Sequence, residues 1–267
     1  LYSAVDAEVG FGRAPVRRAL DDTPLGEWSL HPVRAFEEET GVRLLDLLDV
    51  HCFPQVGSYG TDSSAEAAER RIRTTRSLWD NAYEEESWVG ERIELIPRMQ
   101  KWVDDNYPGT KLSIGEYSFG GETHISGGLA QAEALGRFGQ NGLFSAYYWV
   151  SPQQDSPTFW AFRAYRNYDG AGSRFGELSV PTEADRPLSL FASATEAGDH
   201  NVIVALNTSP DERLATTIEL TGCGRTDATT YPYVGDPSGF ATTDSEMDGD
   251  ELMLDLPPSS ISVIELR

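Results

Sequence analysis

Apolar stretches that look like strands alternate with helical patterns through the first two-thirds of the sequence, and this alternation constrains the fold more than any other feature. Strands are expected at 44–51, 111–120 and 143–150, and helices at 32–40, 63–78, 95–106, 125–138 and 159–168. Such alternation favours parallel βα units, because each helix returns the chain to the start of the next strand. The sequence therefore predicts an α/β fold for this part of the chain.

The pattern changes after Gly170. Short strands then follow one another without helices, separated by turn clusters such as Ala197-Gly198-Asp199. These strands are expected at 188–195, 201–206, 214–220, 228–233, 251–256 and 260–266. Regular short strands without helices are typical of a β-sandwich. A chain of 267 residues can hold two domains, and their boundary is predicted between residues 170 and 185.

The chain is strongly acidic, with 43 Asp and Glu residues against 21 Lys and Arg and a net charge of -22. Such a surface repels phosphates, which argues against a broad nucleic-acid-binding face and suits a soluble protein that acts on neutral substrates. No apolar run approaches about 18 residues, so a membrane span is not expected. Cys52 and Cys223 match no metal-binding spacing. No signal peptide is visible at Leu1, which we interpret as a cut end.

One expected strand ends in a candidate catalytic acid. The run 111–120 has Leu112 and Ile114 at its apolar centre and carries Glu116 near its end, with Tyr117 next to it. In a (β/α) barrel, the carboxyl ends of the strands hold the catalytic residues. Glu116 is therefore a candidate catalytic carboxylate, and the alternative is an ordinary surface glutamate.

His51 and Trp149 end the other two expected strands, so the three strand ends are predicted to form one rim. A carboxylate flanked by an imidazole and aromatic rings suits sugars, whose CH-rich faces lie on rings while polar groups bind the hydroxyls. The candidate sugar platforms are Trp79, Tyr83, Trp88, Tyr147, Trp149 and Trp160. Packing in the core is the alternative for these rings and for His51.

Other acidic side chains carry weaker signals. The cluster Glu84–Glu86 is expected to form a solvated loop. Glu122 and His124 are a weak signal for a metal site. Four aspartates have a spacing unlike an EF-hand calcium loop and fit turn positions better. They are Asp236, Asp244, Asp248 and Asp250.

Several motifs occur in a recognisable order between about residues 43 and 180. They are Leu47–His51, Thr75–Asp80, Glu86–Trp88, Leu95–Met99, Pro108–Tyr117, Tyr147–Trp149 and Ala161–Tyr168. Together they resemble glycoside hydrolase family 44, a family of endoglucanases and xyloglucanases. The sandwich pattern that follows looks like the second domain of that family.

The resemblance implies that residues 1–175 form the C-terminal part of a (β/α)8 TIM barrel, its last three strands, and that residues 176–267 form a β-sandwich domain. The family is a retaining one, so the resemblance implies that Glu116 is the nucleophile. Retention needs a second carboxyl group about 5 to 5.5 Å away as acid/base. In the family this residue lies in an Asn-Glu-Pro motif on an earlier strand, which this sequence lacks. The acid/base is therefore expected upstream of Leu1.

The resemblance also implies a function. We expect a part of a secreted, monomeric retaining hydrolase that cleaves the β-1,4-glucan backbones of plant cell walls, such as cellulose or xyloglucan, without nucleic-acid or membrane partners. No cofactor is required, and a structural calcium ion is compatible with the family although its ligands are not identified. The expected substrate-binding residues are His51, Tyr117, Trp149, Tyr147, Trp79 and Trp88. The alternative is a non-catalytic carbohydrate-binding protein of the same fold.

Overall fold

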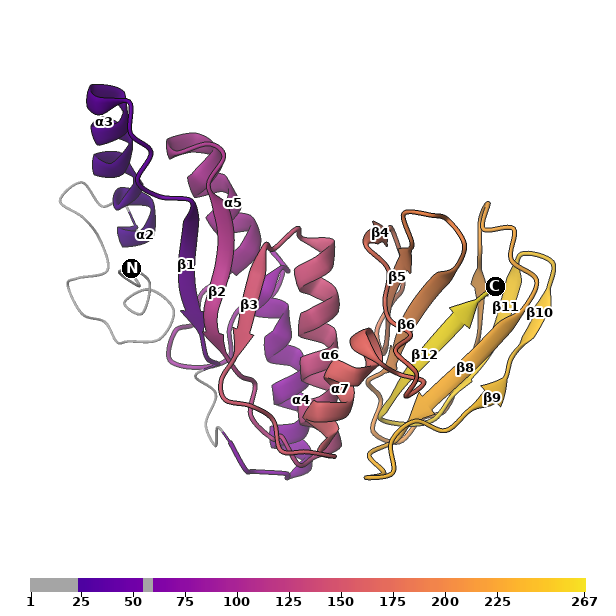
Figure 1. The fold of residues 1–267 in the computed structure, drawn as a ribbon. Helices are drawn as coiled ribbons and strands as arrows, with labels where there is room; N and C mark the ends of the chain where they lie inside the picture. The colour runs from indigo at the N-terminus through magenta and orange to yellow at the C-terminus, as the bar shows by residue number, and fades with distance from the viewer. Residues whose placement is uncertain (1–23, 55–59) are drawn as a thin grey trace. The chain divides into compact units, whose positions relative to one another are not determined.

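The computed structural model describes residues 24–54 and 60–267. The chain forms two compact units, which are described separately (Figure 1). The first takes in the described residues up to 54 together with 73–119 and 137–151, and the second takes in 60–72, 120–136 and 152–267. The predicted domain boundary at residue 175 stays a prediction, because the two units are interleaved along the chain.

A parallel three-stranded sheet forms the centre of the first unit. Its strands lie in the order β1 (Leu47–Cys52), β2 (Lys111–Tyr117) and β3 (Ser145–Tyr148). Helix α5 (Leu95–Asn106) lies in the connection from β1 to β2 and buries one apolar face. That face consists of Leu95, Ile96, Met99, Trp102 and Val103. The predicted alternation of parallel strands and helices is confirmed.

Other helices precede β1 in the sequence or lie between β1 and α5. Helices α2 (Leu25–Trp28) and α3 (Leu30–Thr40) precede β1, and α4 (Ala65–Thr74) runs into a 3-10 helix at Thr75–Leu78. Helix α3 ends at Gly41, where a φ of 70° brings the N–H to the Glu37 carbonyl, because glycine adopts this left-handed conformation without steric cost. No helix in the described ranges is long and apolar enough to cross a membrane.

Two antiparallel sheets form the sandwich of the second unit. The larger has the order β4-β5-β6-β12-β8-β9 and the smaller the order β10-β11-β7. The strands are β4 (Leu178–Val180), β5 (Leu188–Ala194), β6 (Asn201–Asn207), β7 (Leu214–Glu219), β8 (Ala228–Tyr233), β9 (Thr243–Asp244), β10 (Glu246–Asp248), β11 (Glu251–Leu256) and β12 (Ser260–Leu266). All six predicted strands are confirmed to within one residue at each end. The sequence missed β4, β9 and β10, which are too short to show a pattern.

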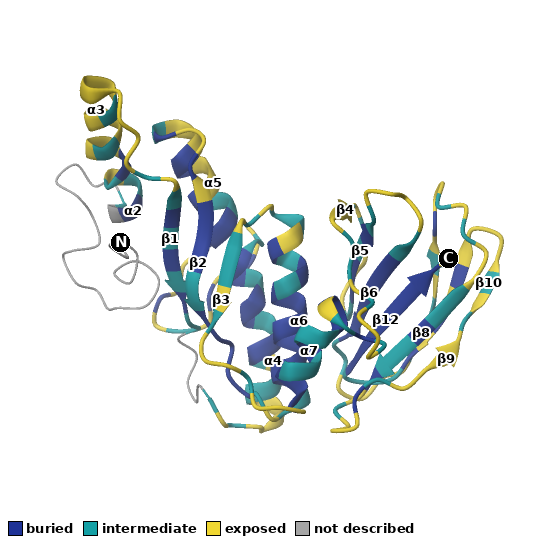
Figure 2. Cartoon of the chain, in the orientation of Figure 1, coloured by how far each residue is buried: buried dark blue, intermediate teal, exposed yellow. Residues whose placement is uncertain are grey.

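The larger sheet is buried on both faces, as the dark centre of β6 and β12 shows in Figure 2. On β6, Val202, Val204 and Leu206 join a core that includes side chains of α6 (Ile125–Gln140) and α7 (Pro157–Arg166). Ile203 and Ala205, which alternate with them, join a second core with the smaller sheet. A strand covered on both faces has apolar side chains at successive positions, which explains the continuous apolar run of β6.

Helix α7 is fixed at its start and along its length. The Ser156 hydroxyl accepts a hydrogen bond from the Phe159 N–H, and Pro157 occupies the first turn, where its missing N–H costs nothing. Further along, the Tyr165 hydroxyl donates to the Ala132 carbonyl of α6 at 2.9 Å. The second contact joins α7 to α6.

Two glycines of α6 give a matched test of this packing. A Cβ at Gly136 would lie 2.3 Å from the Phe191 ring of β5, whereas a Cβ at Gly139 would meet nothing within 4 Å. Alanine is favoured over glycine in a helix by about 1 kcal/mol, but overpacking a core costs about 1–3 kcal/mol. We expect urea unfolding of the chain to show a lower unfolding free energy for Gly136→Ala and an equal or higher one for Gly139→Ala. Equal effects of the two substitutions would contradict the tight contact with Phe191.

Candidate active site

Glu116 and His51 lie side by side at the carboxyl ends of β2 and β1. They are partners in the register of the parallel pair, and His51 Nδ1 lies 3.4 Å from Glu116 Oε2. The side chains are 22% and 32% exposed, respectively. The structure therefore brings the predicted acid and the predicted imidazole together and leaves the carboxylate accessible to a ligand.

A β-bulge at Gly115 decides the face on which Glu116 lies. Val50 pairs with Ile114, but the next residue, His51, pairs with Glu116, and the pairing of β2 with β3 shifts over the same interval. Side chains alternate between the faces of a strand, so in a regular strand Glu116 would share the buried face of Ile114. The extra residue moves Glu116 to the other face, next to His51.

Asp49 occupies the space that a side chain at position 115 would need. A Cβ on Gly115 would lie 2.3 Å from Asp49 Oδ2. Asp49 precedes His51 by two residues on β1, so it shares the face of His51 and Glu116. The roles of Gly115 and Asp49 were not predicted from the sequence. The available signal was a glycine inside a strand, which often marks a bulge or a close approach.

Two exposed aromatic residues lie at the end of β3, Tyr147 within the strand and Trp149 directly after it. Tyr148 pairs with Tyr117, so Tyr147, which precedes it in the strand, points the other way, toward the Glu116 side. Tyr147 and Trp149 are 61% and 52% exposed. The Trp149 N–H donates to the Tyr117 carbonyl at 2.8 Å, which fixes the end of β3 against β2.

Tyr117, which was also predicted to contact substrate, lies in the core. Its side chain is 1% exposed, and its ring makes edge contacts with Phe138 and Tyr148 at centroid distances of 5.1 and 5.6 Å. These contacts are on the face of the sheet opposite to Glu116. The structure therefore does not bring the Tyr117 ring to the Glu116 carboxylate.

The remaining tryptophans differ in their surroundings. Trp88 is 47% exposed in the segment between the 3-10 helix and α5. The Arg137 guanidinium carbon lies 3.9 Å from the centroid of a partly buried Trp79, which is a cation–π geometry. Trp160 packs against Tyr233 in the second unit. Of these three rings, Trp88 is the one open to a ligand.

The prediction of a solvated acidic loop is wrong for Glu85, which is 5% exposed. Its carboxylate accepts hydrogen bonds from the backbone N–H and the hydroxyl of Ser87. Glu86 forms a two-pronged ion pair with Arg73 at 2.9 and 2.8 Å. Bidentate pairs of this kind fix geometry well, so the loop is anchored at two successive residues.

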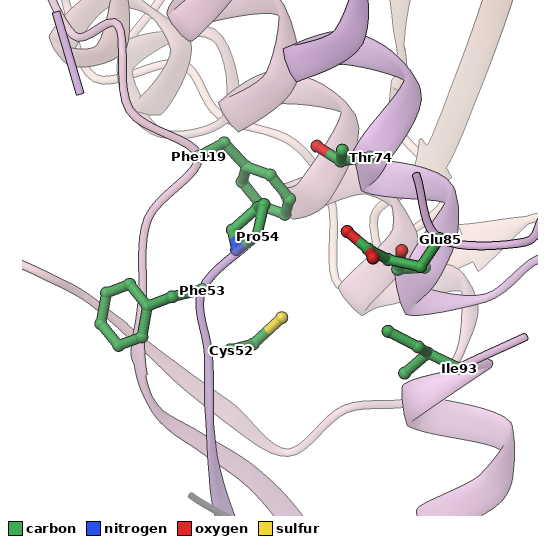
Figure 3. Close-up of a pocket in the computed structure, with 8 residues that line it drawn as sticks. Cys52, Phe53, Pro54, Thr74, Glu85, Ile93 and Phe119 are labelled. Atoms are coloured by element: carbon green, nitrogen blue, oxygen red, sulfur yellow. The ribbon is translucent and has the colours of Figure 1, made fainter. Parts of the chain in front are cut away.

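A small cavity of about 20 Å³ lies next to Cys52, with Phe119, Ile93 and Glu85 among its lining residues (Figure 3). This volume is about enough for one water molecule. Burial, together with the charge of Glu85, raises the pKa of the Cys52 thiol to about 12. The thiol therefore stays protonated near neutral pH and is not a nucleophile.

His124 caps a helix in the second unit. Its Nδ1 accepts the Ser126 backbone N–H at 3.3 Å and lies 2.9 Å from the Ser126 hydroxyl. The buried Arg71 donates to that hydroxyl at 2.6 Å. Burial and the charge of Arg71 lower the pKa of His124. The ring is therefore neutral at pH 7, with its proton on Nε2.

Among the residues that the structure describes, no three His, Cys, Asp or Glu side chains gather as a metal site. Asp236 accepts hydrogen bonds from the N–H and the hydroxyl of Ser238, as expected for a turn residue. The calcium ion allowed by the family resemblance stays a prediction, because calcium also takes backbone and amide carbonyl oxygens as ligands.

Comparison with known proteins finds homologues in one family, although no family model matches the sequence. Endoglucanase A of Paenibacillus lautus is 34% identical over 258 residues, which are 90% of this chain and 37% of that protein. CelM2, a bifunctional glucanase-xylanase from a metagenome library, superimposes with a TM-score of 0.90 at 35% identity. A family 44 xyloglucanase of Paenibacillus polymyxa, solved with xyloglucan, gives a TM-score of 0.85 at 30% identity.

The chain is a homologue of the family 44 glycoside hydrolases. The alignment with CelM2 covers 94% of this chain and 49% of CelM2. The alignment with the xyloglucanase covers 91% of this chain and 51% of the xyloglucanase. The chain therefore spans about half the length of these solved relatives. The matched part consists of parallel β-α units followed by antiparallel sheets, so the predicted fold class, part of the family 44 barrel followed by the sandwich, is confirmed.

The bulge at Gly115 can be tested with a double-mutant cycle. We expect Gly115→Ala to lower the unfolding free energy by about 1–3 kcal/mol, because the new Cβ overlaps the Asp49 carboxylate. Adding Asp49→Ala removes that overlap and should restore most of the loss, whereas Asp49→Ala alone serves as the control. Urea unfolding gives the unfolding free energy of the wild type, the two single variants and the double variant. A double variant as unstable as Gly115→Ala would show that backbone conformation, and not Asp49, requires the glycine.

The His124 cap predicts a pH dependence of stability. An unfolded histidine binds a proton near pH 6.5, whereas the folded His124 binds it only at a lower pH. The contribution of the cap is therefore complete above about pH 6.5 and is lost as the pH falls toward the lowered pKa. We expect His124→Asn, which retains a capping side chain without titrating, to lose less stability between pH 7.5 and 5 than the wild type does. Identical pH profiles would contradict this assignment.

Proposed function

We propose that this chain is part of a retaining glycoside hydrolase that cleaves β-1,4-glucan backbones, with Glu116 as the nucleophile. The observation that carries the proposal is the position of the Glu116 carboxylate. It lies at the carboxyl end of a parallel strand, 3.4 Å from His51 and on the accessible face of the sheet. Catalytic residues of (β/α) barrels lie at this end of their strands.

The chemistry follows from the carboxylate. One Glu116 oxygen attacks the anomeric carbon of the sugar and displaces the rest of the glucan chain, which leaves a covalent glycosyl-enzyme; water then releases the sugar and regenerates the carboxylate. His51 Nδ1 faces Oε2, so a proton on Nδ1 would hold that oxygen and direct the other toward the substrate. This role makes His51 a positioning residue that also reaches sugar hydroxyls.

The acid/base is proposed to lie outside this chain. Departure of an alkoxide from the sugar is slow unless a carboxylic acid protonates it. The family motif that carries this acid is absent from the sequence, and the solved relatives are about twice as long. We therefore assign the complete activity to a longer protein that contains this chain.

The substrate is proposed to be a β-1,4-glucan of the plant cell wall, such as xyloglucan, outside the cell. The Paenibacillus polymyxa relative was solved with xyloglucan, and Tyr147 and Trp149 offer exposed rings at the end of β3, the strand that pairs with the Glu116 strand. A sugar face stacked on such a ring gains apolar contact without losing its hydroxyl contacts. Trp88, also exposed, is proposed as a further contact.

Replacement of the nucleophile tests the proposal. In the protein extended to the length of its relatives, we expect Glu116→Gln to lower turnover of xyloglucan by several orders of magnitude, because an amide does not form the glycosyl-enzyme. Binding of the polysaccharide, measured by calorimetry, should change little. Glu84→Gln, at an exposed position, is the matched control and should retain full activity. A Glu116→Gln enzyme that keeps more than about a tenth of wild-type turnover would overturn the assignment.

The 267-residue chain by itself provides the complementary measurement. We expect it to release no reducing sugar from xyloglucan, and to remain inactive on a glucoside with an activated phenolate leaving group, because the barrel around Glu116 is incomplete. Activity on the phenolate substrate alone would place the defect in the missing acid. Activity on xyloglucan would show that an acid/base is present in this chain.

A further inference from the structure

Two polar oxygens of residues that line the small cavity beside Cys52 have no hydrogen-bond partner among the described residues. They are Glu85 Oε1 and Ser77 Oγ, and their residues are 5% and 9% exposed. The Glu85 carboxylate and the Cys52 sulfur both point into the enclosed space (Figure 3). Buried polar groups nearly always bond to protein or to ordered water, so these two oxygens indicate that the cavity holds a polar ligand.

Glu85 has the stronger requirement for a partner. Its other oxygen, Oε2, accepts hydrogen bonds from the backbone N–H and the hydroxyl of Ser87. No Lys, Arg or His among the described residues lines the cavity, so no basic side chain there balances the charge of the carboxylate. A carboxylate kept from bulk water is costly unless its oxygens have donors. The partner of Oε1 must therefore be a hydrogen-bond donor that fits the cavity.

The volume and the polar groups of the cavity select a water molecule. A volume of about 20 Å³ holds one water and nothing larger. A water can donate to Glu85 Oε1 and accept hydrogen bonds from the Ser77 hydroxyl and from the Cys52 thiol, which is protonated near neutral pH. Three hydrogen bonds are typical of a buried water. An anion is disfavoured, because the charge of Glu85 would repel it.

We propose that this cavity is a binding site for one ordered water molecule, which bridges Glu85 Oε1, the Ser77 hydroxyl and the Cys52 thiol. The water joins the end of β1, the 3-10 helix Thr75–Leu78 and the loop that follows this helix. A hard metal ion is disfavoured, because such ions take about six or more oxygen ligands. The proposal uses neither Glu116 nor a longer polypeptide, so it is independent of the proposed function.

The water fixes the base of the loop that carries Trp88. The Glu85 N–H donates to the Glu91 carbonyl at 3.0 Å, which closes the loop, and Glu85 Oε2 accepts two hydrogen bonds from Ser87 inside it. Trp88, the next residue, is 47% exposed. Because Glu85 bonds to the loop through one oxygen and to the water through the other, the water connects the base of this loop to the end of β1.

Two buried serines provide a test in solution. Ser262 of β12 has, like Ser77, a hydroxyl with no partner among the described residues, but it does not line this cavity. We expect Ser77→Ala to lower the melting temperature of its unit by about 2–4 °C, because the water loses one of its hydrogen bonds. Ser262→Ala, the matched control, should leave the melting temperature of its unit unchanged or raise it, because it removes an unsatisfied hydroxyl. A Ser77→Ala variant as stable as the wild type would contradict the water bridge.

A crystal structure of the chain tests the occupant directly. We expect an ordered water about 2.7–3.2 Å from both Glu85 Oε1 and Ser77 Oγ, and no anomalous peak there after a soak in rubidium chloride. A rubidium peak would identify a monovalent cation as the ligand. A direct hydrogen bond between the Ser77 hydroxyl and Glu85, or no density at this position, would show that no water bridges them. Each of these three results would overturn the proposal.

Discussion

The arrangement of the candidate site depends on one irregular residue in β2. Gly115 forms a bulge that turns Glu116 from the buried face of the sheet to the face of His51. The bulge tolerates no side chain, because the Asp49 carboxylate lies where a Cβ would be. Bulges are common beside active sites for this reason, since one extra residue redirects a side chain without breaking the sheet. With the bulge, the Glu116 carboxylate is accessible for chemistry. In a regular strand, the same carboxylate would lie on the buried face of Ile114.

The sandwich depends on a different constraint, which is that its larger sheet has two apolar faces. One face is covered by α6, α7 and part of α4, and the other by the smaller sheet. The contact of Gly136 with Phe191 shows how closely the helix packs on the first face. The second face is covered less completely, because the smaller sheet has three strands against six. A groove lined by residues of β7 and β5 lies where the smaller sheet ends.

Much of the architecture could be predicted from the sequence. Helix α5 and strands β8, β11 and β12 have the predicted bounds, because apolar spacing and turn residues mark them clearly. The family resemblance rested on ordered motifs and is confirmed by solved family 44 structures at 31% and 30% identity. The missed strands β4, β9 and β10 have two or three residues each, which is too few for alternation to be recognised.

The sequence by itself determined the order of strands and helices, because the spacing of apolar residues reflects which positions must leave water. It also placed an acid, an imidazole and an indole at the ends of three successive strands. Only the tertiary structure decided which way those side chains face. Tyr117 looked as available as Glu116 but packs against Phe138 and Tyr148, and Glu85 looked solvated but is buried. These outcomes depend on a one-residue shift in register and on contacts between residues distant in sequence, which local spacing does not record.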